Sequence, residues 1–239
     1  MNNQHRRESQ NIHVMDDYMQ QFQSYKPWYE SRRRHPLINE ITYRRIKRLL
    51  DISLCLITLP FVLPILGLCC LAIKLDSCGP LFFLQERTGK GGRRFKMYKL
   101  RTMIANAESL KAEYMHLNEL SYPDFKIRED PRITTVGSFL RKTSLDELPQ
   151  IFNVLKGEMS WIGPRPTSFS AQTYSLWHTT RLDIVPGITG LWQILGRNEL
   201  DFDKRLRLDI AYLRHQCLWL DIRILIRTIG CIFNGKGAN

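Results

Sequence analysis

One long run of apolar residues dominates the hydrophobic pattern of this 239-residue chain. Residues 52–73 contain no aspartate, glutamate, lysine or arginine. A straight helix of this length would measure roughly 33 Å, which matches the hydrocarbon core of a bilayer. Pro60 and Pro64 lie near the middle of the run, and each removes a backbone donor and clashes with the preceding helical turn. The pattern therefore predicts a membrane segment whose helix is kinked or broken at its centre.

Basic residues flank the apolar run on both sides. Residues 44–48 are mostly basic, and residues 87–101 are rich in lysine and arginine without a single acid. A single span fits the length and the prolines equally well, because membrane helices tolerate proline. The positive-inside rule, however, places both basic stretches in the cytoplasm, and a straight span would export the second. The charges therefore favour a re-entrant hairpin that enters and leaves through one leaflet, with Arg48 and Asp51 paired at the membrane boundary.

Shorter periodic patterns predict the elements outside the apolar run. Apolar residues on either side of a glycine-rich turn at residues 89–92 predict a β-hairpin with strands at 81–84 and 95–100. Apolar residues three and four positions apart predict helices at residues 104–120, 136–142, 144–155, 200–216 and 219–233. Glycine-bearing turns are expected at residues 186–193 and 196–198.

These elements predict an α+β fold that is mostly helical, with a compact cytosolic domain on a proline-broken re-entrant membrane helix hairpin. We expect a polar N-terminal tail at residues 1–43, the membrane anchor at 44–76, and a domain with interfacial helices at 77–239 that carries the chemistry. The polar composition of the tail predicts that it is mostly disordered, and an amphipathic helix around residues 18–28 is the alternative. The last helix belongs either to the core, the commoner arrangement, or to the membrane surface.

The net charge and the cysteine content limit the classes of molecule that the protein is expected to bind. A formal net charge of +12 would suit nucleic acid, but basic residues beside an apolar anchor more often meet anionic lipids or phosphorylated substrates. We therefore expect no nucleic-acid partner. The six cysteines form no CxxC pair, and Cys55, Cys69 and Cys70 lie in the apolar run, so we expect reduced thiols. No cleavable signal peptide is expected, because the first apolar run begins about fifty residues into the chain.

Two adjacent acids, Asp146 and Glu147, are the main chemical candidates. They lie at a predicted helix start, where unpaired amides and the helix dipole favour negative charge and could hold phosphate close by. Capping alone would also explain them, either as a Ser144–Glu147 capping box or with Asp146 as the cap. The sequence leaves these alternatives open.

Nearby arginines favour the functional interpretation of the two acids. Arg141 precedes them, and Arg165 lies between Pro164 and Pro166, which fix its backbone. Both guanidiniums suit bidentate contacts with phosphate. Carboxylates together with substrate phosphates also imply Mg²⁺, a hard cation that usually keeps waters and bridges such oxygen ligands. The chain shows no histidine cluster for zinc, no Walker phosphate loop and no GxSxG motif.

The chain closely resembles the bacterial sugar transferase family, the monotopic phosphoglycosyl transferases. The resemblance covers roughly residues 44–233 and rests on seven motifs in one order: KRLLD, KLDSCGPLFF, FKMYKLRTM, DPRIT, LRKTSLDELPQIFNVLKGEMS, GPRP and PGITGLWQ. It is similar to the short members that start exopolysaccharide synthesis, since the four-helix membrane region of the long members is absent.

The resemblance implies transfer of a hexose 1-phosphate from a UDP-hexose to undecaprenyl phosphate, with release of UMP, at the cytoplasmic face of the bacterial inner membrane. It implies that Asp146 is the nucleophile of a covalent intermediate and that Glu147 helps to hold Mg²⁺ or assists the transfer. Arg141 and Arg165, the latter held by Pro164 and Pro166, carry over as phosphate contacts. Asp209 fits the same pattern, and an ordinary helix-surface acid explains it equally well. The remaining basic residues could face lipid headgroups instead of substrate; they are Lys96, Lys99 and Arg101.

The chain also departs from the family pattern. Leu63 precedes Pro64 where relatives commonly have serine, so no hydroxyl is available at the kink, although Pro60 could compensate. Cys78 replaces a usual proline and Trp161 a smaller aliphatic residue.

Two other function classes remain as alternatives. A membrane-recruited scaffold that binds lipid and proteins would not need two acids and two arginines together, and a polybasic nucleic-acid-binding protein would not need the apolar anchor. Inner-membrane lipids are expected partners, and a homodimer is left open.

Overall fold

The computed structural model describes residues 39–110, 112–119, 127, 129–170, 172, 176–195 and 200–233. The chain divides into two compact units, residues 1–39 and 40–239. The predicted disorder of the tail and the alternative helix at 18–28 lie outside the described residues, as does the turn at 196–198. The second unit is a mostly helical α+β structure built around one long apolar helix, which is long and apolar enough to cross a membrane.

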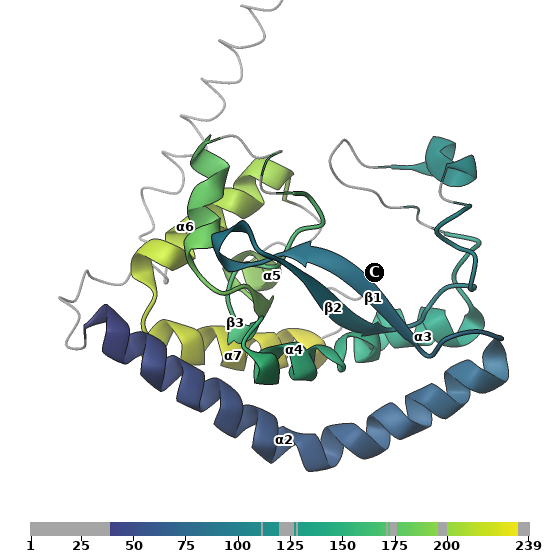
Figure 1. Cartoon of the computed structure of the whole chain (residues 1–239), viewed down its shortest axis with the longest axis horizontal. Helices are drawn as coiled ribbons and strands as arrows, with labels where there is room; N and C mark the ends of the chain where they lie inside the picture. The colour runs from purple at the N-terminus through teal and green to yellow at the C-terminus, as the bar shows by residue number, and fades with distance from the viewer. Residues whose placement is uncertain are drawn as a thin grey trace, which may run out of the picture. The chain divides into compact units, whose positions relative to one another are not determined.

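That long helix is α2 (Glu40–Asp76), and it contains both Pro60 and Pro64. The chain stays helical through both prolines, so the expected break of the helix is not confirmed. The axis instead changes direction near its middle (Figure 1). A bend is the usual outcome when proline removes a hydrogen bond but the neighbouring turns remain helical.

Both halves of α2 pack against the same body. In the first half, the side chain of Cys55 is fully buried in one core cluster. In the second half, Leu66, Cys69 and Ile73 are buried in another. The other buried members of the two clusters are Met97, Ile151, Val154 and Met159 in the first and Leu100 and Leu140 in the second. The large apolar side chains that α2 leaves exposed include Leu56, Ile57, Phe61, Leu63 and Leu68.

The predicted ion pair between Arg48 and Asp51 is wrong. Asp51 is buried, and its Oδ1 accepts hydrogen bonds from Ser160 Oγ (3.0 Å) and from the backbone N–H of Trp161 (3.1 Å). Arg48 donates to two backbone carbonyls at the end of α4 (Gln150–Lys156), those of residues 154 and 155, at 2.5 and 2.7 Å. The last carbonyls of a helix lack partners within the helix and attract cations, which explains why Arg48 turns away from Asp51.

The predicted hairpin is confirmed. Strands β1 (Phe82–Thr88) and β2 (Arg94–Leu100) pair antiparallel around the short 3₁₀ helix η2 (Lys90–Gly92). Gly91 has a φ of 64°, a left-handed conformation that glycine adopts without steric cost. The fully buried Asn153 of α4 links the helix to β2, since its side chain accepts from the N–H of Tyr98 (3.0 Å) and donates to the carbonyl of Lys96 (2.8 Å).

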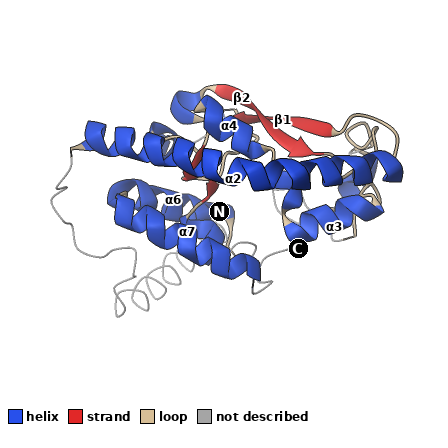
Figure 2. Ribbon diagram, turned by 90° about the horizontal axis from the view of Figure 1, so that it is seen from below, coloured by secondary structure: helices blue, strands red, loops and turns tan. Residues whose placement is uncertain are grey.

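A second, parallel pair of short strands lies between the helices: β3 (Ser160–Ile162) pairs with β4 (Gly187–Thr189). The segment predicted as a turn at 186–193 therefore contains β4 and the start of α5 (Leu191–Leu195). The remaining elements are α3 (Thr135–Thr143), η4 (Leu145–Glu147), η6 (Leu176–Asp183), α6 (Phe202–His215) and α7 (Leu218–Phe233). Helix α2 lies along one edge of the domain in Figure 1; in Figure 2, seen from below, it crosses in front, with the hairpin and α4 on one side of its line and α6 and α7 on the other.

One helix prediction is wrong, and the prediction of the last helix is confirmed. Among the described residues of 104–120, only turns and the 3₁₀ helix η3 (Glu113–Leu117) form. Met115 and Leu117 are exposed there, and a short helix without a packed face is marginal in water. The last helix, α7, buries Leu220 and Ile224 but exposes an apolar stripe, so it is both a core helix and an apolar surface. The exposed stripe consists of Trp219, Ile222, Ile226 and Ile229.

Candidate active site

The two acids lie in a short 3₁₀ turn between α3 and α4. Ser144 ends α3 with a φ of 58°, an uncommon left-handed conformation for a residue other than glycine. Helix α4 begins only at Gln150, and no side chain caps it. Both predicted caps are therefore wrong: the chain reverses at Ser144 and presents Asp146 and Glu147 from η4 before the helix begins.

Asp146 has a carboxylate that makes no hydrogen bond with the described residues. The residue is 8% exposed, and the nearest cation is Lys99, whose Nζ lies 4.0 Å from Oδ2. Burial raises the pKa of Asp146, and the charge of Glu147 adds to the increase. Lys99, Arg141 and Arg165 oppose it. Asp146 is thus a desolvated carboxylate surrounded by cations that do not occupy its oxygens.

The carboxylate of Glu147, unlike that of Asp146, accepts hydrogen bonds from two cations. Its Oε1 accepts a hydrogen bond from Lys99 Nζ at 2.9 Å and a very short one from Arg165 Nη2, and its Oε2 accepts from Arg165 Nη1 at 3.2 Å. Burial alone would raise its pKa, but Arg165 and Lys99 hold the pKa of Glu147 well below its usual range. Glu147 is therefore ionised and committed to two cations.

The predicted phosphate contacts are partly brought together. Arg165 lies on the loop after β3, between the two prolines, and reaches Glu147 directly. Arg141, near the end of α3, donates its Nε to Thr102 Oγ1 at 2.9 Å, and its charge acts on Asp146. Its Nη groups make no hydrogen bond or ion pair with the described residues and are available to an anion. Asp209 is 1% exposed in α6 and faces Arg181 at 2.7 Å, not the two acids.

Lys99 is the functional residue that the sequence interpretation missed. The sequence left open whether Lys99 and Arg101 face lipid headgroups or substrate. In the structure Lys99 binds Glu147, and the buried Arg101 donates to the carbonyl and hydroxyl of Ser77 just after α2. Residues two apart in a strand share a face. Met97, which is buried in the core, lies two residues before Lys99 in β2, so a strand face shared with an apolar residue was the signal that the sequence offered for Lys99. Only Lys96 of this set is exposed.

The donor set decides which metal the site could take. The described residues contain no cluster of three or more histidine, cysteine, aspartate or glutamate side chains. Mg²⁺ commonly needs only one or two carboxylates, with phosphate oxygens and water as its other ligands. Asp146 has oxygens free of hydrogen bonds, whereas both oxygens of Glu147 are engaged by cations. The residues present therefore fit Mg²⁺ through Asp146 and a bound phosphate.

The chain resembles known proteins over most of its length. It matches the family described as bacterial sugar transferase over residues 42–235. Galactosyl transferase CpsE of Streptococcus agalactiae serotype III (strain NEM316) is 42% identical over 201 residues, which cover 80% of this chain and 43% of CpsE. Undecaprenyl-phosphate galactose phosphotransferase of Salmonella typhimurium is 40% identical over 200 residues (82% of this chain, 42% of the relative).

Exopolysaccharide production protein ExoY of Sinorhizobium fredii is closer in length. It is 36% identical over 197 residues, which cover 80% of this chain and 87% of ExoY. The chain thus spans less than half the length of the first two relatives and most of the length of ExoY.

The contrast between the two acids predicts opposite effects on stability. Glu147→Gln leaves Lys99 and Arg165 without their shared carboxylate, so we expect a loss of about 3 kcal/mol and a clear fall in Tm. Asp146→Asn should leave Tm unchanged or raise it, because a raised pKa means that the ionised Asp146 costs folding stability at neutral pH. Thermal unfolding of both purified variants in one detergent measures this. An equal fall in Tm for the two variants would contradict the assignment.

Proposed function

Since the chain belongs to the bacterial sugar transferase family, we propose that it is a phosphoglycosyl transferase. In this proposal it transfers a hexose 1-phosphate from a UDP-hexose to undecaprenyl phosphate and releases UMP, as the first step of exopolysaccharide or related glycan assembly. The names of the relatives, an undecaprenyl-phosphate galactose phosphotransferase and an exopolysaccharide production protein, support this class of reaction.

One observation carries the proposal: two adjacent carboxylates are held in different states. Glu147 binds Lys99 and Arg165, while Asp146 faces the same cations with its oxygens uncommitted. A nucleophile needs a free lone pair, and the negative charge that develops on a phosphoryl group needs cations already in place. The pair supplies both, with Asp146 as the nucleophile and Glu147 as the group that orders the cations.

In the first step, an Asp146 carboxylate oxygen attacks the β-phosphorus of the UDP-hexose. A bond forms between that oxygen and phosphorus, and the bond from phosphorus to the oxygen that bridges to the α-phosphate breaks. UMP leaves with that electron pair, and the hexose phosphate stays on Asp146 as an acyl phosphate. Arg141, Arg165 and Lys99 stabilise the charge on the phosphoryl oxygens and on the departing UMP.

In the second step, a phosphate oxygen of undecaprenyl phosphate attacks the same phosphorus. The bond to Asp146 breaks, and the carboxylate is restored as the lipid-linked hexose diphosphate leaves. Mg²⁺, when bound through Asp146 and the donor phosphates, would supply further charge neutralisation at the transferring group. Because donor and acceptor react in turn with the same carboxylate, the kinetics should be ping-pong.

We also propose that α2 is a re-entrant membrane hairpin whose two ends lie in the cytoplasm, at the inner membrane. Both halves of α2 pack against one domain, through Cys55 on one side of the bend and Leu66 and Ile73 on the other. A span would carry the second half to the far side of the bilayer and separate it from that core. The apolar residues at the bend are exposed, as expected for a surface that meets lipid. In this proposal the site lies at the inner leaflet, within reach of the acceptor phosphate.

The reaction is tested with membranes that contain the protein, undecaprenyl phosphate and a panel of UDP-hexoses. We expect release of UMP with at least one donor and its loss by several orders of magnitude in Asp146→Asn, because an amide is a far poorer nucleophile. Asp183→Asn, which alters an exposed acid outside the site, should remain near wild type. Full activity in Asp146→Asn would disprove the mechanism.

The pH dependence tests the role of Lys99. Asp146 must be ionised to attack, so kcat/KM should rise with pH through a pKa above the usual aspartate range. Lys99 lowers that pKa, so Lys99→Met should move the acid limb of the profile to higher pH. Lys96→Met, which removes an exposed lysine from the same strand, should leave the limb in place. A limb that stays fixed or moves to lower pH in Lys99→Met would contradict this electrostatic role.

The hairpin is tested with a membrane-impermeant thiol reagent on intact cells. Cys78, just after α2, and Cys217, before α7, are both exposed, and each can be kept as the single cysteine. We expect neither to react until the cells are permeabilised. Replacing Pro60 and Pro64 with leucine should straighten α2 and expose Cys78 to the reagent, because it restores two donors and removes two clashes. Labelling of Cys78 in intact cells with both prolines present would show a span.

A further inference from the structure

The backbone of residues 164–166, the loop that carries Arg165, accepts hydrogen bonds through its carbonyl oxygens. Pro164 and Pro166 have no N–H, so neither can donate a hydrogen bond to a neighbouring strand. Three consecutive carbonyls instead accept from three separate donors. The contacts are Gly187 N–H to the carbonyl of Pro164 at 2.9 Å, Arg181 Nη2 to that of Arg165 at 2.5 Å, and Arg87 Nη1 to that of Pro166 at 3.2 Å.

The central donor of the three, Arg181, is itself fixed. Its side chain on η6 is only 5% exposed, and Nη2 lies 2.7 Å from Oδ2 of Asp209 on α6, whose side chain is 2% exposed. One guanidinium nitrogen thus contacts both the carboxylate of Asp209 and the backbone of Arg165. The contact reaches the one loop residue whose side chain binds Glu147.

We propose that Arg181, oriented by Asp209, is a positioning residue that holds Arg165 against Glu147 and so aligns the phosphate-binding cations without touching the substrate. The inference rests on the proposed function and extends it to residues outside the site. The line of contacts runs from α6 through η6 to the Arg165 backbone, and from the Arg165 side chain to Glu147 and Lys99.

A purely structural ion pair would not need this geometry. Buried ion pairs contribute little to stability compared with well-packed apolar residues, so Asp209 and Arg181 are poorly explained as a source of stability alone. Their additional contact, to the carbonyl of an arginine in the site, gives the pair a use that apolar side chains could not supply. A displacement of a positioned group by about 1 Å can lower the reaction rate roughly 100-fold.

The raised pKa of Asp209 indicates that a variant lacking Arg181 should still fold. Burial raises the pKa of Asp209 to about 7, against the opposing charges of Arg181 and Arg205. Without Arg181 that pKa would rise further, and Asp209 would take up a proton instead of remaining as an unpaired buried charge. Arg181→Met should therefore fold. Arg181→Lys should keep part of the function, since its ammonium keeps the positive charge and can donate to at least one of the two acceptors.

The test is a double-mutant cycle on kcat/KM for the UDP-hexose. We expect Arg181→Met to lower kcat/KM roughly 100-fold in the wild-type background but less than about 3-fold in Arg165→Met, because the residue that Arg181 positions is then absent. Arg48→Met is the matched control, because Arg48 also donates to backbone carbonyls but at the end of α4. Its effect should be the same in both backgrounds. An equal loss for Arg181→Met in the two backgrounds would overturn the proposal.

A second cycle needs no substrate, and it separates this inference from the proposed function. Arg181→Met and Glu147→Gln are combined, and Tm is measured for each single variant and the double variant. If Arg181 holds Arg165 on Glu147, the double variant should lose less than the sum of the two single losses. Additive losses would overturn the positioning role. Absence of UMP release from the wild-type protein with every donor would instead overturn the proposed function and leave this cycle as the decisive test of Arg181.

Discussion

The carboxylate of Glu147 is the contact on which the arrangement of the site depends. It accepts from Lys99 on β2 and from Arg165 after β3, while its own backbone belongs to the turn between α3 and α4. Three segments that are distant in sequence are fixed against one another by this one group. Because Glu147 accepts hydrogen bonds from both cations, it holds them beside Asp146 without using the oxygens of Asp146. The adjacent acid is therefore left desolvated and free to react.

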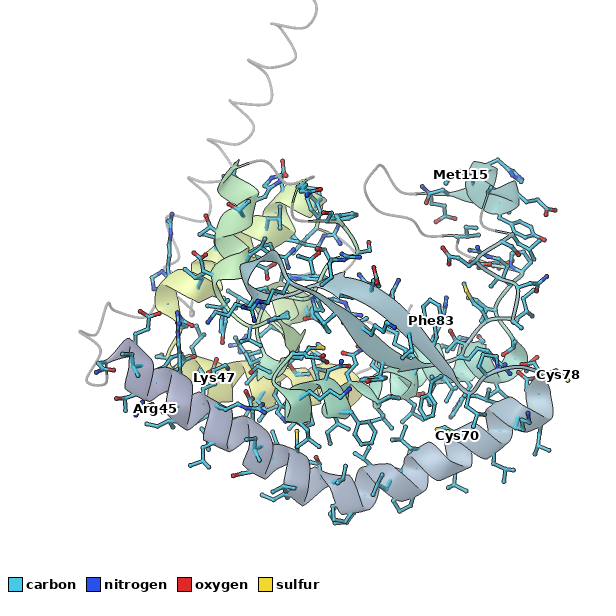
Figure 3. All side chains as sticks on the ribbon, in the orientation of Figure 1. Arg45, Lys47, Cys70, Cys78, Phe83 and Met115 are labelled. Carbon is cyan, nitrogen blue, oxygen red and sulfur yellow. The ribbon has the colours of Figure 1, made fainter. Side chains whose placement is uncertain are left out.

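Helix α2 is joined to the rest of the domain by buried hydrogen bonds. Asp221 of α7 is buried and accepts hydrogen bonds from Tyr43 (2.9 Å) and Lys47 (2.9 Å) of α2 and from Tyr212 (2.6 Å) of α6. Lys47 lies on α2 near its first turns (Figure 3). Burial raises the pKa of Tyr212, and the charge of Asp221 adds to the effect, so the phenol remains a donor. The long apolar helix α2 is thus joined to α6 and α7 by buried hydrogen bonds, and it shares a hydrophobic core with β2 and α4.

The sequence allowed some of this to be predicted, for identifiable physical reasons. The hairpin, α3, α6 and α7 follow from local periodicity and from glycine at a turn, and the two acids and Arg165 follow from their chemistry and motif context. The contacts of Asp51 with Ser160, of Lys99 with Glu147 and of Arg181 with the Arg165 backbone join residues far apart in the chain, and no local pattern specifies such partners. The prediction of a helix at residues 104–120 was wrong because the periodicity of a segment does not reveal whether another part of the protein packs against it.

Covalent attachment of hexose phosphate to Asp146 is the central claim, and intact-protein mass spectrometry tests it most directly. The purified protein is incubated with the UDP-hexose that supports UMP release, with Mg²⁺ and without undecaprenyl phosphate, and its mass is measured. The account predicts an added mass of one hexose phosphate, which disappears when undecaprenyl phosphate is supplied and never forms in Asp146→Asn. Turnover without any adduct in the wild-type protein, or the same adduct in Asp146→Asn, would contradict it.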